Sequence, residues 1–200
     1  MYDILNQFLK IMSEELNEFT DISPYTDAEA VEALGKLADH PAVVEVSKAI
    51  FPDKEPEFLR KILKSVKSID EFQILVMNKA VEWVLSTTAH NFSYDGIGNL
   101  KKINGKFLAM SNHRDIILDP AITQVVLYRN AIPMTEIAVG SNLLTNKYIE
   151  YLIRSNRMIK VIRGINARQL YLSSQVLSKY IRDAITSGKS SIWIAQREGR

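Results

Sequence analysis

His113 is followed at short range by two aspartates, Asp115 and Asp119, within the stretch from Ser111 to Pro120. A histidine held by a carboxylate can act as a general base, because the carboxylate fixes the imidazole tautomer and stabilises the protonated ring. Either aspartate could be that partner. Short polar side chains also cap helices and satisfy buried turns, so the reaction has to be inferred from the rest of the chain.

The surrounding pattern predicts where His113 lies in the fold. An apolar run at 107–110 precedes it and a helical pattern at 117–129 follows, which together indicate a strand, a turn and a helix. Alternation of strands and helices continues to the end of the sequence and predicts an α/β fold, with an at least partly parallel sheet and helical crossovers. The further strands are expected at 135–139, 158–162 and 191–195, and the further helices at 143–156 and 167–187.

The loops that follow these strands carry polar or basic residues, namely 140–142, Arg163 and 197–200. In a parallel sheet the carboxyl ends of the strands lie at one edge, which is where α/β proteins usually bind ligands. We therefore expect these loops to converge on His113.

Residues 1–91 carry only helical patterns and form a predicted N-terminal helical domain. Capping boxes at Thr26–Glu29 and Ser68–Glu71 mark the starts of two helices. A turn-rich stretch at 95–99 separates these helices from the α/β domain, which we assign to residues 92–200. The helices of the bundle are expected at 2–19, 26–39, 41–51, 56–63 and 68–85.

Composition restricts the possible partners and chemistry. The 200 residues include 25 Lys and Arg against 23 Asp and Glu, a balance that gives no indication of a nucleic-acid partner. The segment 147–168 is locally basic and could meet an anion. The sequence has no cysteine, which excludes disulfides, thiolate nucleophiles and cysteine metal sites.

Hydropathy gives no indication of a membrane span. No apolar run approaches the ~20 residues that a spanning helix needs, and residues 1–10 lack the pattern of a signal peptide. We expect a cytoplasmic protein that is peripheral to the membrane.

Two other chemistries find little support. His113-Arg114-Asp115 matches the start of a protein-kinase catalytic loop, but Pro120 stands where that loop needs an asparagine. The three histidines lie far apart and lack the short spacings of zinc ligands, and nothing positive supports magnesium at the aspartates. We expect no metal, and we expect His40 and His90 to have capping or surface roles near helix ends.

Acyl transfer by a general base fits the residues that are present. A histidine paired with a carboxylate can take the proton of a substrate hydroxyl as its oxygen attacks a thioester, so no protein nucleophile and no cofactor are needed. The sequence contains neither a cysteine nor a Gly-x-Ser-x-Gly motif.

Three stretches in order resemble the sequence blocks of the glycerolipid acyltransferases, the glycerol-3-phosphate acyltransferases and their lysophosphatidate relatives. Asn112-His113 followed by Asp119-Pro120 is similar to the first block, whose signature is a His, four residues and an Asp. The stretch 140–164, which ends in an apolar strand and Arg163, resembles the middle blocks. The stretch 192–200, with its Glu-Gly turn and arginine, resembles the third block.

The resemblance implies a reaction and a role for each residue. An acyl group would pass from acyl-CoA or acyl-carrier protein to a hydroxyl of glycerol 3-phosphate or a lysophospholipid, at a membrane surface. His113 would be the base and Asp119 its support, while the acceptor phosphate would be bound by Arg163, Glu198, Gly199 and Arg200.

The chain departs from the family pattern at two points. Asp119 lies one residue later than the signature requires, so Asp115 stays a candidate partner of His113. The sequence stops inside the third block, whereas the family domain continues with further strands, so we expect a sheet truncated at its C-terminal side. The alternative is a non-catalytic peripheral membrane or lipid-binding module, in which the segment 147–168 contacts anionic headgroups.

Overall fold

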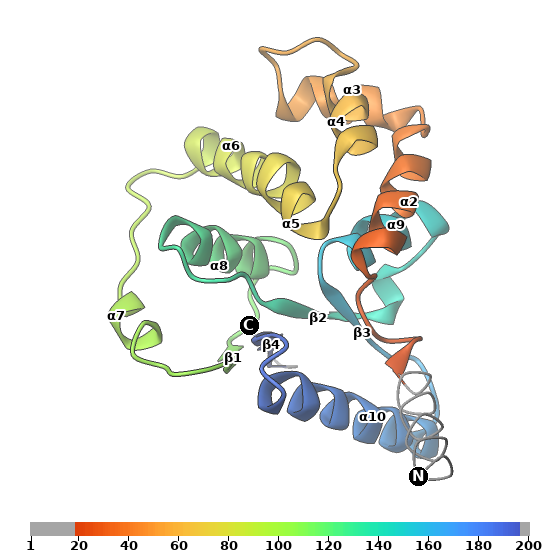
Figure 1. Cartoon of the computed structure of the whole chain (residues 1–200), viewed down its shortest axis with the longest axis vertical. Coiled ribbons are helices and arrows are strands. Elements are labelled where there is room, and N and C mark those ends of the chain that lie inside the picture. The colour runs from red at the N-terminus through yellow and green to blue at the C-terminus, as the bar shows by residue number, and fades with distance from the viewer. Residues whose placement is uncertain (1–18, 197–200) are drawn as a thin grey trace, which may run out of the picture.

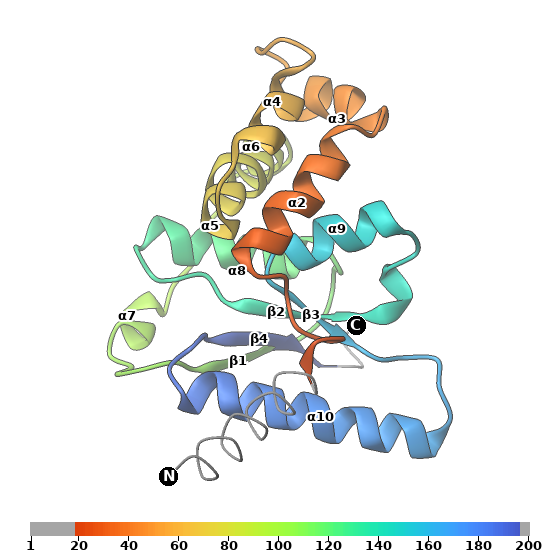
Figure 2. The ribbon, with the colours of Figure 1, turned by 45° about the vertical axis from the view of Figure 1, so that its right-hand side comes forward.

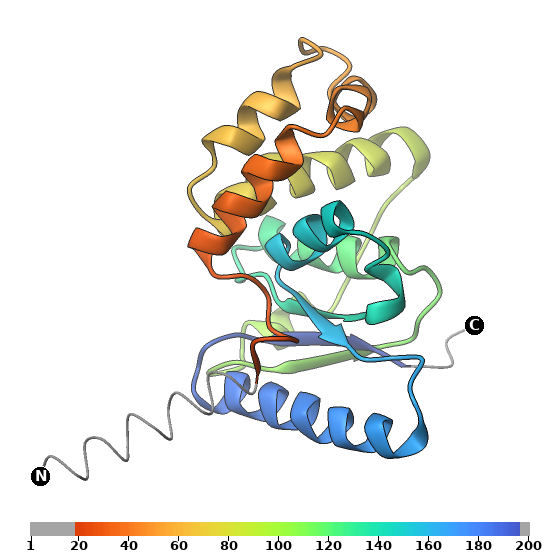
Figure 3. The ribbon, with the colours of Figure 1, turned by 90° about the vertical axis from the view of Figure 1, so that its right-hand side faces the viewer.

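The structure is a computed structural model that describes residues 19–196. Its helices and strands form stacked layers (Figures 1 and 2). The N-terminal helices lie at one end, followed by a pair of crossover helices, the sheet, and one long helix on the opposite face of the sheet (Figure 3). The predicted helix at 2–19 lies outside the described residues except for Phe19.

The N-terminal helices follow the capping and periodic patterns of the sequence. Thr26 and Glu29 form a reciprocal capping box, and the Ser68 side chain accepts from the amide of Glu71, so both helix starts are confirmed. The apolar faces meet in one core that includes Leu34, Leu63 and Phe72. The elements are α2 (Asp27–Ala38), α3 (Ala42–Ile50), α4 (Phe58–Ser65), α5 (Ile69–Phe72), the π-helix η1 (Gln73–Met77) and α6 (Asn78–Thr88).

The predicted fifth helix is interrupted by η1. The amide of Asn78 donates to the carbonyl of Gln73, five residues back, which widens the helix by one residue over this turn. The apolar pattern of 68–85 suits a continuous α-helix as well as one with a π-helical turn. Periodicity therefore predicts the helix but not its π turn.

The α/β part contains a four-stranded sheet in the order β1-β4-β2-β3, and every strand pairing in it is parallel. This confirms the predicted α/β class and the helical crossovers. The helices α8 and α9 cover the face toward the N-terminal helices, and α10 covers the other face (Figure 2). The strands are β1 (Leu108–Ser111), β2 (Glu136–Gly140), β3 (Met158–Val161) and β4 (Ile192–Ala195); the helices are α7 (Ile97–Leu100), α8 (Leu118–Arg129), η2 (Ser141–Leu143), α9 (Lys147–Ser155) and α10 (Ala167–Thr186).

The helix predicted at 143–156 starts later than expected. A short 3₁₀ turn, η2, follows β2 directly, and α9 begins only after Asn146, whose side chain accepts from the amides of Tyr148 and Ile149. An N-cap of this kind satisfies amides that the first helical turn leaves unpaired. Residues 141–146, which lie between β2 and α9, therefore form a loop at the edge of the sheet.

The two parts of the chain are joined by packing and polar contacts. Phe19 and Ile22 precede the N-terminal helices yet pack in the core between the sheet and α10, where Phe19 makes an edge contact with Tyr180. Arg157, just before β3, bonds Gln73 and Asp70 of the N-terminal helices, and Arg129 of α8 pairs with Glu82 of α6. The helical part thus rests on the face of the sheet that α8 and α9 cover.

Among residues 19–196, none of the helices has the length and apolar character needed to cross a membrane.

Candidate active site

The three predicted catalytic residues lie in the loop between β1 and α8 and in the first turn of α8. One Asp119 carboxylate oxygen, Oδ2, accepts from the backbone amides of Arg114 and Asp115 at 2.7 and 2.9 Å. The Asp115 oxygen Oδ1 instead accepts from the amides of Ile117 and Leu118 at 2.8 and 2.7 Å. The two aspartates therefore hold the backbone of residues 114–118 by accepting from two different pairs of amides.

Asp119 is the aspartate that faces the histidine. Its Oδ2 lies 3.5 Å from Nδ1 of His113, and the two side chains are 25% and 31% exposed. Nδ1 is itself buried and makes no hydrogen bond within the described part of the chain, so the two side chains are close to each other but are not hydrogen-bonded. Catalytic hydrogen bonds are often long before substrate binds, so a separation of this size is compatible with a general base and its support.

Asp115 has a different role, at the start of α8. Its carboxylate accepts from the amides of Ile117 and Leu118, which the beginning of the helix leaves without a partner inside the helix. Asp119 then lies on the first turn of α8, next to His113. Of the two candidate partners, the geometry selects Asp119.

Hydrogen bonds keep both carboxylates ionised. The backbone amide of Asp115 is the main cause that lowers the pKa of Asp119, with further contributions from the Arg114 amide and from His113, against the effect of burial. The amides of Leu118 and Ile117 lower the pKa of Asp115 in the same way. At neutral pH, His113 thus faces a carboxylate and not a carboxylic acid.

A cavity of about 440 Å³, which we call the histidine cavity, opens along the carboxyl ends of the strands. His113, from the end of β1, and Arg163, from the end of β3, both line it, as the sequence predicted for parallel strands. Asn142 and Gln196 add polar groups. The volume falls in the ~300–1,000 Å³ range of small-molecule sites.

Gly140 allows Arg163 to reach this cavity. A Cβ atom at position 140 would lie 3.0 Å from Nε of Arg163 and would also clash with Asn142, so a larger residue would displace both side chains. The amide of Arg163 donates to the Ser141 hydroxyl at 3.0 Å, which ties the loop after β3 to the loop after β2.

The basic segment 147–168 is mostly neutralised within the chain. Lys147 and Arg154 pair with Glu150, while Arg157 pairs with Asp70 and Lys160 with Asp21. Arg163 and Arg168 form no ion pair with any residue in the range 19–196. Of these two arginines, Arg163 lines the histidine cavity.

The other predicted site residues, Glu198, Gly199 and Arg200, lie outside the described residues. The last described residue, Gln196, lines the histidine cavity, and its amide donates to the carbonyl of Ser111 at 2.9 Å. The end of β4 is thereby held beside the end of β1, from which the His113 loop begins.

A second cavity, which we call the apolar cavity, adjoins the first. It measures about 330 Å³ and lies between α6, α8, α9 and the sheet. Both cavities share six lining residues, so they lie next to each other. The shared residues are Ile116, Pro120, Ile137, Val139, Leu143 and Met158.

Sequence reasoning missed the apolar cavity. Its lining residues come from both halves of the chain, for example Asn78 from α6 and Val125 from α8. Each of them is an ordinary core position in its own helix. Only the docking of the N-terminal helices over α8 and α9 brings them together, and no local pattern encodes that docking.

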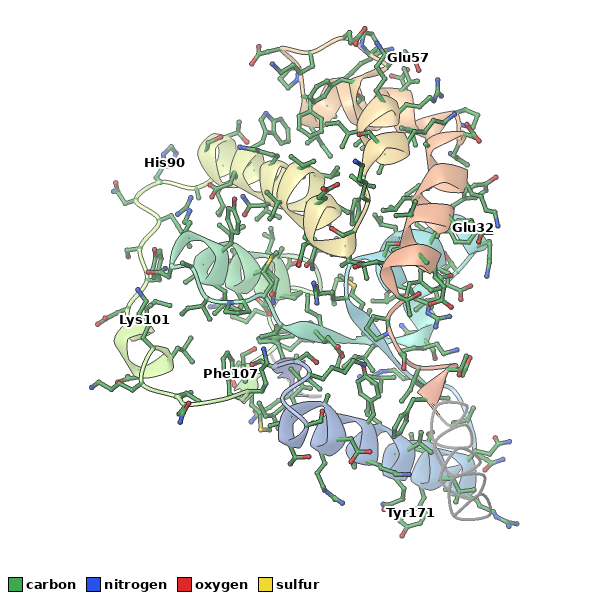
Figure 4. All side chains as sticks on the ribbon, viewed as in Figure 1. Glu32, Glu57, His90, Lys101, Phe107 and Tyr171 are labelled. Atoms are coloured by element: carbon green, nitrogen blue, oxygen red, sulfur yellow. The ribbon has the colours of Figure 1, made fainter. Side chains whose placement is uncertain are left out.

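The remaining histidines lie away from this site. His40 accepts a hydrogen bond from the amide of Ala42 at the start of α3 and packs against Tyr148, which confirms its capping role. His90 lies exposed on the segment that follows α6 (Figure 4).

No family model matches the chain, and no curated protein matches it significantly. The family resemblance therefore stays an inference from the three sequence blocks.

Proposed function

We propose that the protein is an acyltransferase that moves a fatty acyl group from acyl-CoA or acyl-carrier protein to a hydroxyl of glycerol 3-phosphate or a lysophospholipid. The observation that carries this proposal is the His113–Asp119 pair beside a cavity that shares six lining residues with an adjoining apolar one. A base beside a hydrocarbon-lined space is what transfer of an acyl chain requires.

In the proposed mechanism, unprotonated His113 takes the proton from the acceptor hydroxyl as its oxygen attacks the thioester carbonyl. Asp119 orients the imidazole and stabilises its charged form. The tetrahedral intermediate collapses, the carbon–sulfur bond breaks, and the proton on His113 passes to the leaving thiolate. The products are an ester and a free thiol, and the reaction uses no cofactor.

Arg163 is the proposed binding residue for the acceptor phosphate, because it lines the histidine cavity and its guanidinium has no ion-pair partner within residues 19–196. An arginine suits a phosphate through paired N–H donors. Glu198, Gly199 and Arg200 are proposed for the same subsite on the family resemblance alone.

A membrane surface is the proposed source of a lipid acceptor. Ile116 and Ile117, on the loop that carries His113, are 58% and 68% exposed. Exposed apolar side chains of this kind suit a surface that inserts into the acyl region of a membrane. On this basis we propose a cytoplasmic protein that works at the membrane surface.

The alternative, a lipid-binding module without catalysis, would rely on the basic segment 147–168. Four of its six cations are already paired within the chain, so that segment offers little free charge to headgroups. The enzyme is the better supported proposal.

The test is a thioester-release assay on the full-length protein with acyl-CoA, run with glycerol 3-phosphate and then with lysophosphatidate. We expect His113→Ala to lower transfer by about 10³-fold while the melting temperature stays close to that of the wild type, because general-base catalysis contributes ~10²–10⁴. His90→Ala is the matched control. Turnover by His113→Ala within a few-fold of the wild type would overturn the proposal.

A further inference from the structure

Gly140 is the last residue of β2 and lines the histidine cavity. It pairs in register with Val161, the last residue of β3. Its backbone is extended, with φ −66° and ψ 135°, a conformation that residues with a side chain also adopt. The backbone therefore does not require a glycine at this position, and the space beside the Cα atom is what a larger residue would disturb.

That space is occupied by two polar side chains. A Cβ atom at position 140 would clash with Oδ1 of Asn142 and would lie 3.0 Å from Nε and 3.1 Å from Cδ of Arg163. Both side chains are flexible, so they would yield to a methyl group while β2 and its pairing with β3 stay as they are. Position 140 thus controls where these side chains lie without controlling the fold.

The other glycines within residues 19–196 differ from Gly140. Gly35 and Gly98 have no atom within 4 Å of an added Cβ. The remaining ones have a positive φ, which favours glycine through the backbone itself; they are Gly96, Gly105, Gly164 and Gly188. Within this range, a close approach by the side chains of other residues is specific to Gly140.

The order of the strands gives the direction in which the arginine extends. Arg163 follows β3, and its amide donates to the hydroxyl of Ser141 beside the end of β2. Its Cδ and Nε lie over Gly140. In the order β1-β4-β2-β3, a step from β3 to β2 is a step toward β1, after which His113 lies. The side chain of Arg163 therefore extends over the end of β2 toward the side of the cavity that His113 lines.

We propose that Gly140 is a positioning residue for the acceptor. By leaving the end of β2 without a side chain, it lets Arg163 extend toward His113 and bind the acceptor phosphate on that side of the cavity. The proposal rests on the proposed acyltransferase function, in which Arg163 binds this phosphate. Gly140 itself takes no part in the chemical step, and a side chain at this position weakens acceptor binding because it moves the arginine.

The test is steady-state kinetics of the full-length protein with acyl-CoA and either glycerol 3-phosphate or lysophosphatidate, since both acceptors carry a phosphate monoester. For the acceptor that the wild type uses, Gly140→Ala should raise KM about tenfold, the order of a lost hydrogen bond between charged groups. The value of kcat and the KM for acyl-CoA should stay within about threefold of the wild type, as expected when binding alone is lost. An acceptor KM within about twofold of the wild type would overturn the proposal.

Gly35→Ala is the matched control, because it adds the same methyl group where no atom lies within 4 Å. It should leave the acceptor KM unchanged. Thermal unfolding of Gly140→Ala should give a melting temperature within a few degrees of the wild type, since only side chains move.

Double variants show whether Gly140 acts through Arg163. Arg163→Ala removes both arginine atoms that crowd position 140, so adding Gly140→Ala to it should raise the acceptor KM no further. Asn142→Ala removes the closest contact, and in this background the full effect of Gly140→Ala should persist. Additive effects of Gly140→Ala and Arg163→Ala would overturn the proposal, and so would an effect that vanishes in Asn142→Ala.

Failure of the acyltransferase function would look different. Calorimetry measures binding of glycerol 3-phosphate and of lysophosphatidate without an acyl donor, and Gly140→Ala should weaken that binding about tenfold. Thioester release that does not depend on His113 would reject the reaction. Equal binding to the wild type and to Gly140→Ala, or no binding of either compound to the wild type, would reject the role of Gly140.

Discussion

The two edges of the sheet differ in how their buried polar groups are paired. At the amino ends of the strands, the buried Glu136 carboxylate accepts hydrogen bonds from neighbouring hydroxyls. At the carboxyl ends, Nδ1 of His113 is buried and has no hydrogen-bond partner among residues 19–196. Glu136, at the start of β2, accepts from the hydroxyls of Tyr180 at 2.6 Å and Ser190 at 2.8 Å. Lys189 lies over the Tyr180 ring and donates to its hydroxyl. Burial is the main cause that raises the pKa of Tyr180, and Glu136 adds to it, so the hydroxyl stays a donor at any physiological pH.

The difference separates a cluster whose buried polar groups pair with one another from a histidine whose buried nitrogen faces Asp119 without a hydrogen bond. Buried polar groups are normally paired, because an unpaired one costs about 1–3 kcal/mol. In the part of the chain that the structure describes, three buried side-chain atoms are unpaired, and two of them belong to His113 and Asn78, residues that line the two adjoining cavities. The third, the hydroxyl of Ser155, lies at the end of α9.

Among the variants that test this comparison of the two edges, Asp119→Asn at the carboxyl edge is expected to have the largest effect. The asparagine oxygen can still accept from the amides of Arg114 and Asp115, so the loop should keep its shape. The side chain can no longer stabilise a protonated His113. We expect kcat for acyl transfer to fall by about 10²-fold or more, with a melting temperature within a few degrees of the wild type.

This prediction is checked by thioester release in parallel with thermal unfolding. Asp115→Asn is the matched control, because it changes the neighbouring carboxylate in the same loop and should leave the rate close to that of the wild type. If Asp115→Asn lost as much activity as Asp119→Asn, the assignment of the histidine partner would be wrong.

The next largest effect is expected at the amino edge, from Glu136→Ala. The change leaves the hydroxyls of Tyr180 and Ser190 buried without an acceptor, so the free energy of unfolding should fall by about 3 kcal/mol. Glu136→Gln keeps one acceptor and the shape, and should lose less. Urea unfolding measures both.

The comparison would fail if Glu136→Ala were as stable as the wild type or lost transfer activity without losing stability. Either result would mean that the amino edge also has a functional role. In that case pairing of polar groups would not distinguish the two edges of the sheet.

Much of the fold could be predicted because its signals are local. Every predicted strand end lies within one residue of the observed one, because short apolar runs bounded by polar turns define the strands. The alternation of strands and helices predicted a parallel sheet with helical crossovers. His113 and Arg163 were expected at one edge for the same topological reason, and both line the histidine cavity.

What could not be predicted depends on contacts between distant segments. The choice between Asp115 and Asp119 depends on which backbone amides each carboxylate reaches in a folded turn. Asn78 is one polar residue in a helical pattern, and it lines the apolar cavity only because α6 packs over α8. The sequence assigns Phe19 and Ile22 to the N-terminal helical domain. In the structure, the amide of Lys160 donates to the carbonyl of Ile22 and holds this residue beside β3.

The smallest effect expected is that of Asp115→Ala, which tests whether this carboxylate is purely structural. The change removes the acceptor for the amides of Ile117 and Leu118 at the start of α8, which lie in a largely exposed loop, so at pH 7 the melting temperature should fall by only a few degrees. The effect of Asp115→Ala should also depend on pH. The hydrogen bonds to the amides of Ile117 and Leu118 hold the folded-state pKa of Asp115 below its ordinary value near 3.8. A carboxyl whose pKa is lowered by folding stabilises the protein above its unfolded pKa, and this contribution is lost as the pH falls through the folded pKa. The difference in melting temperature between wild type and variant should therefore be full at neutral pH and should shrink below about pH 4. A difference in melting temperature that does not change over that pH range would show that Asp115 acts through something other than its charge. A large loss of transfer activity in Asp115→Ala would show that Asp115, and not only Asp119, supports His113.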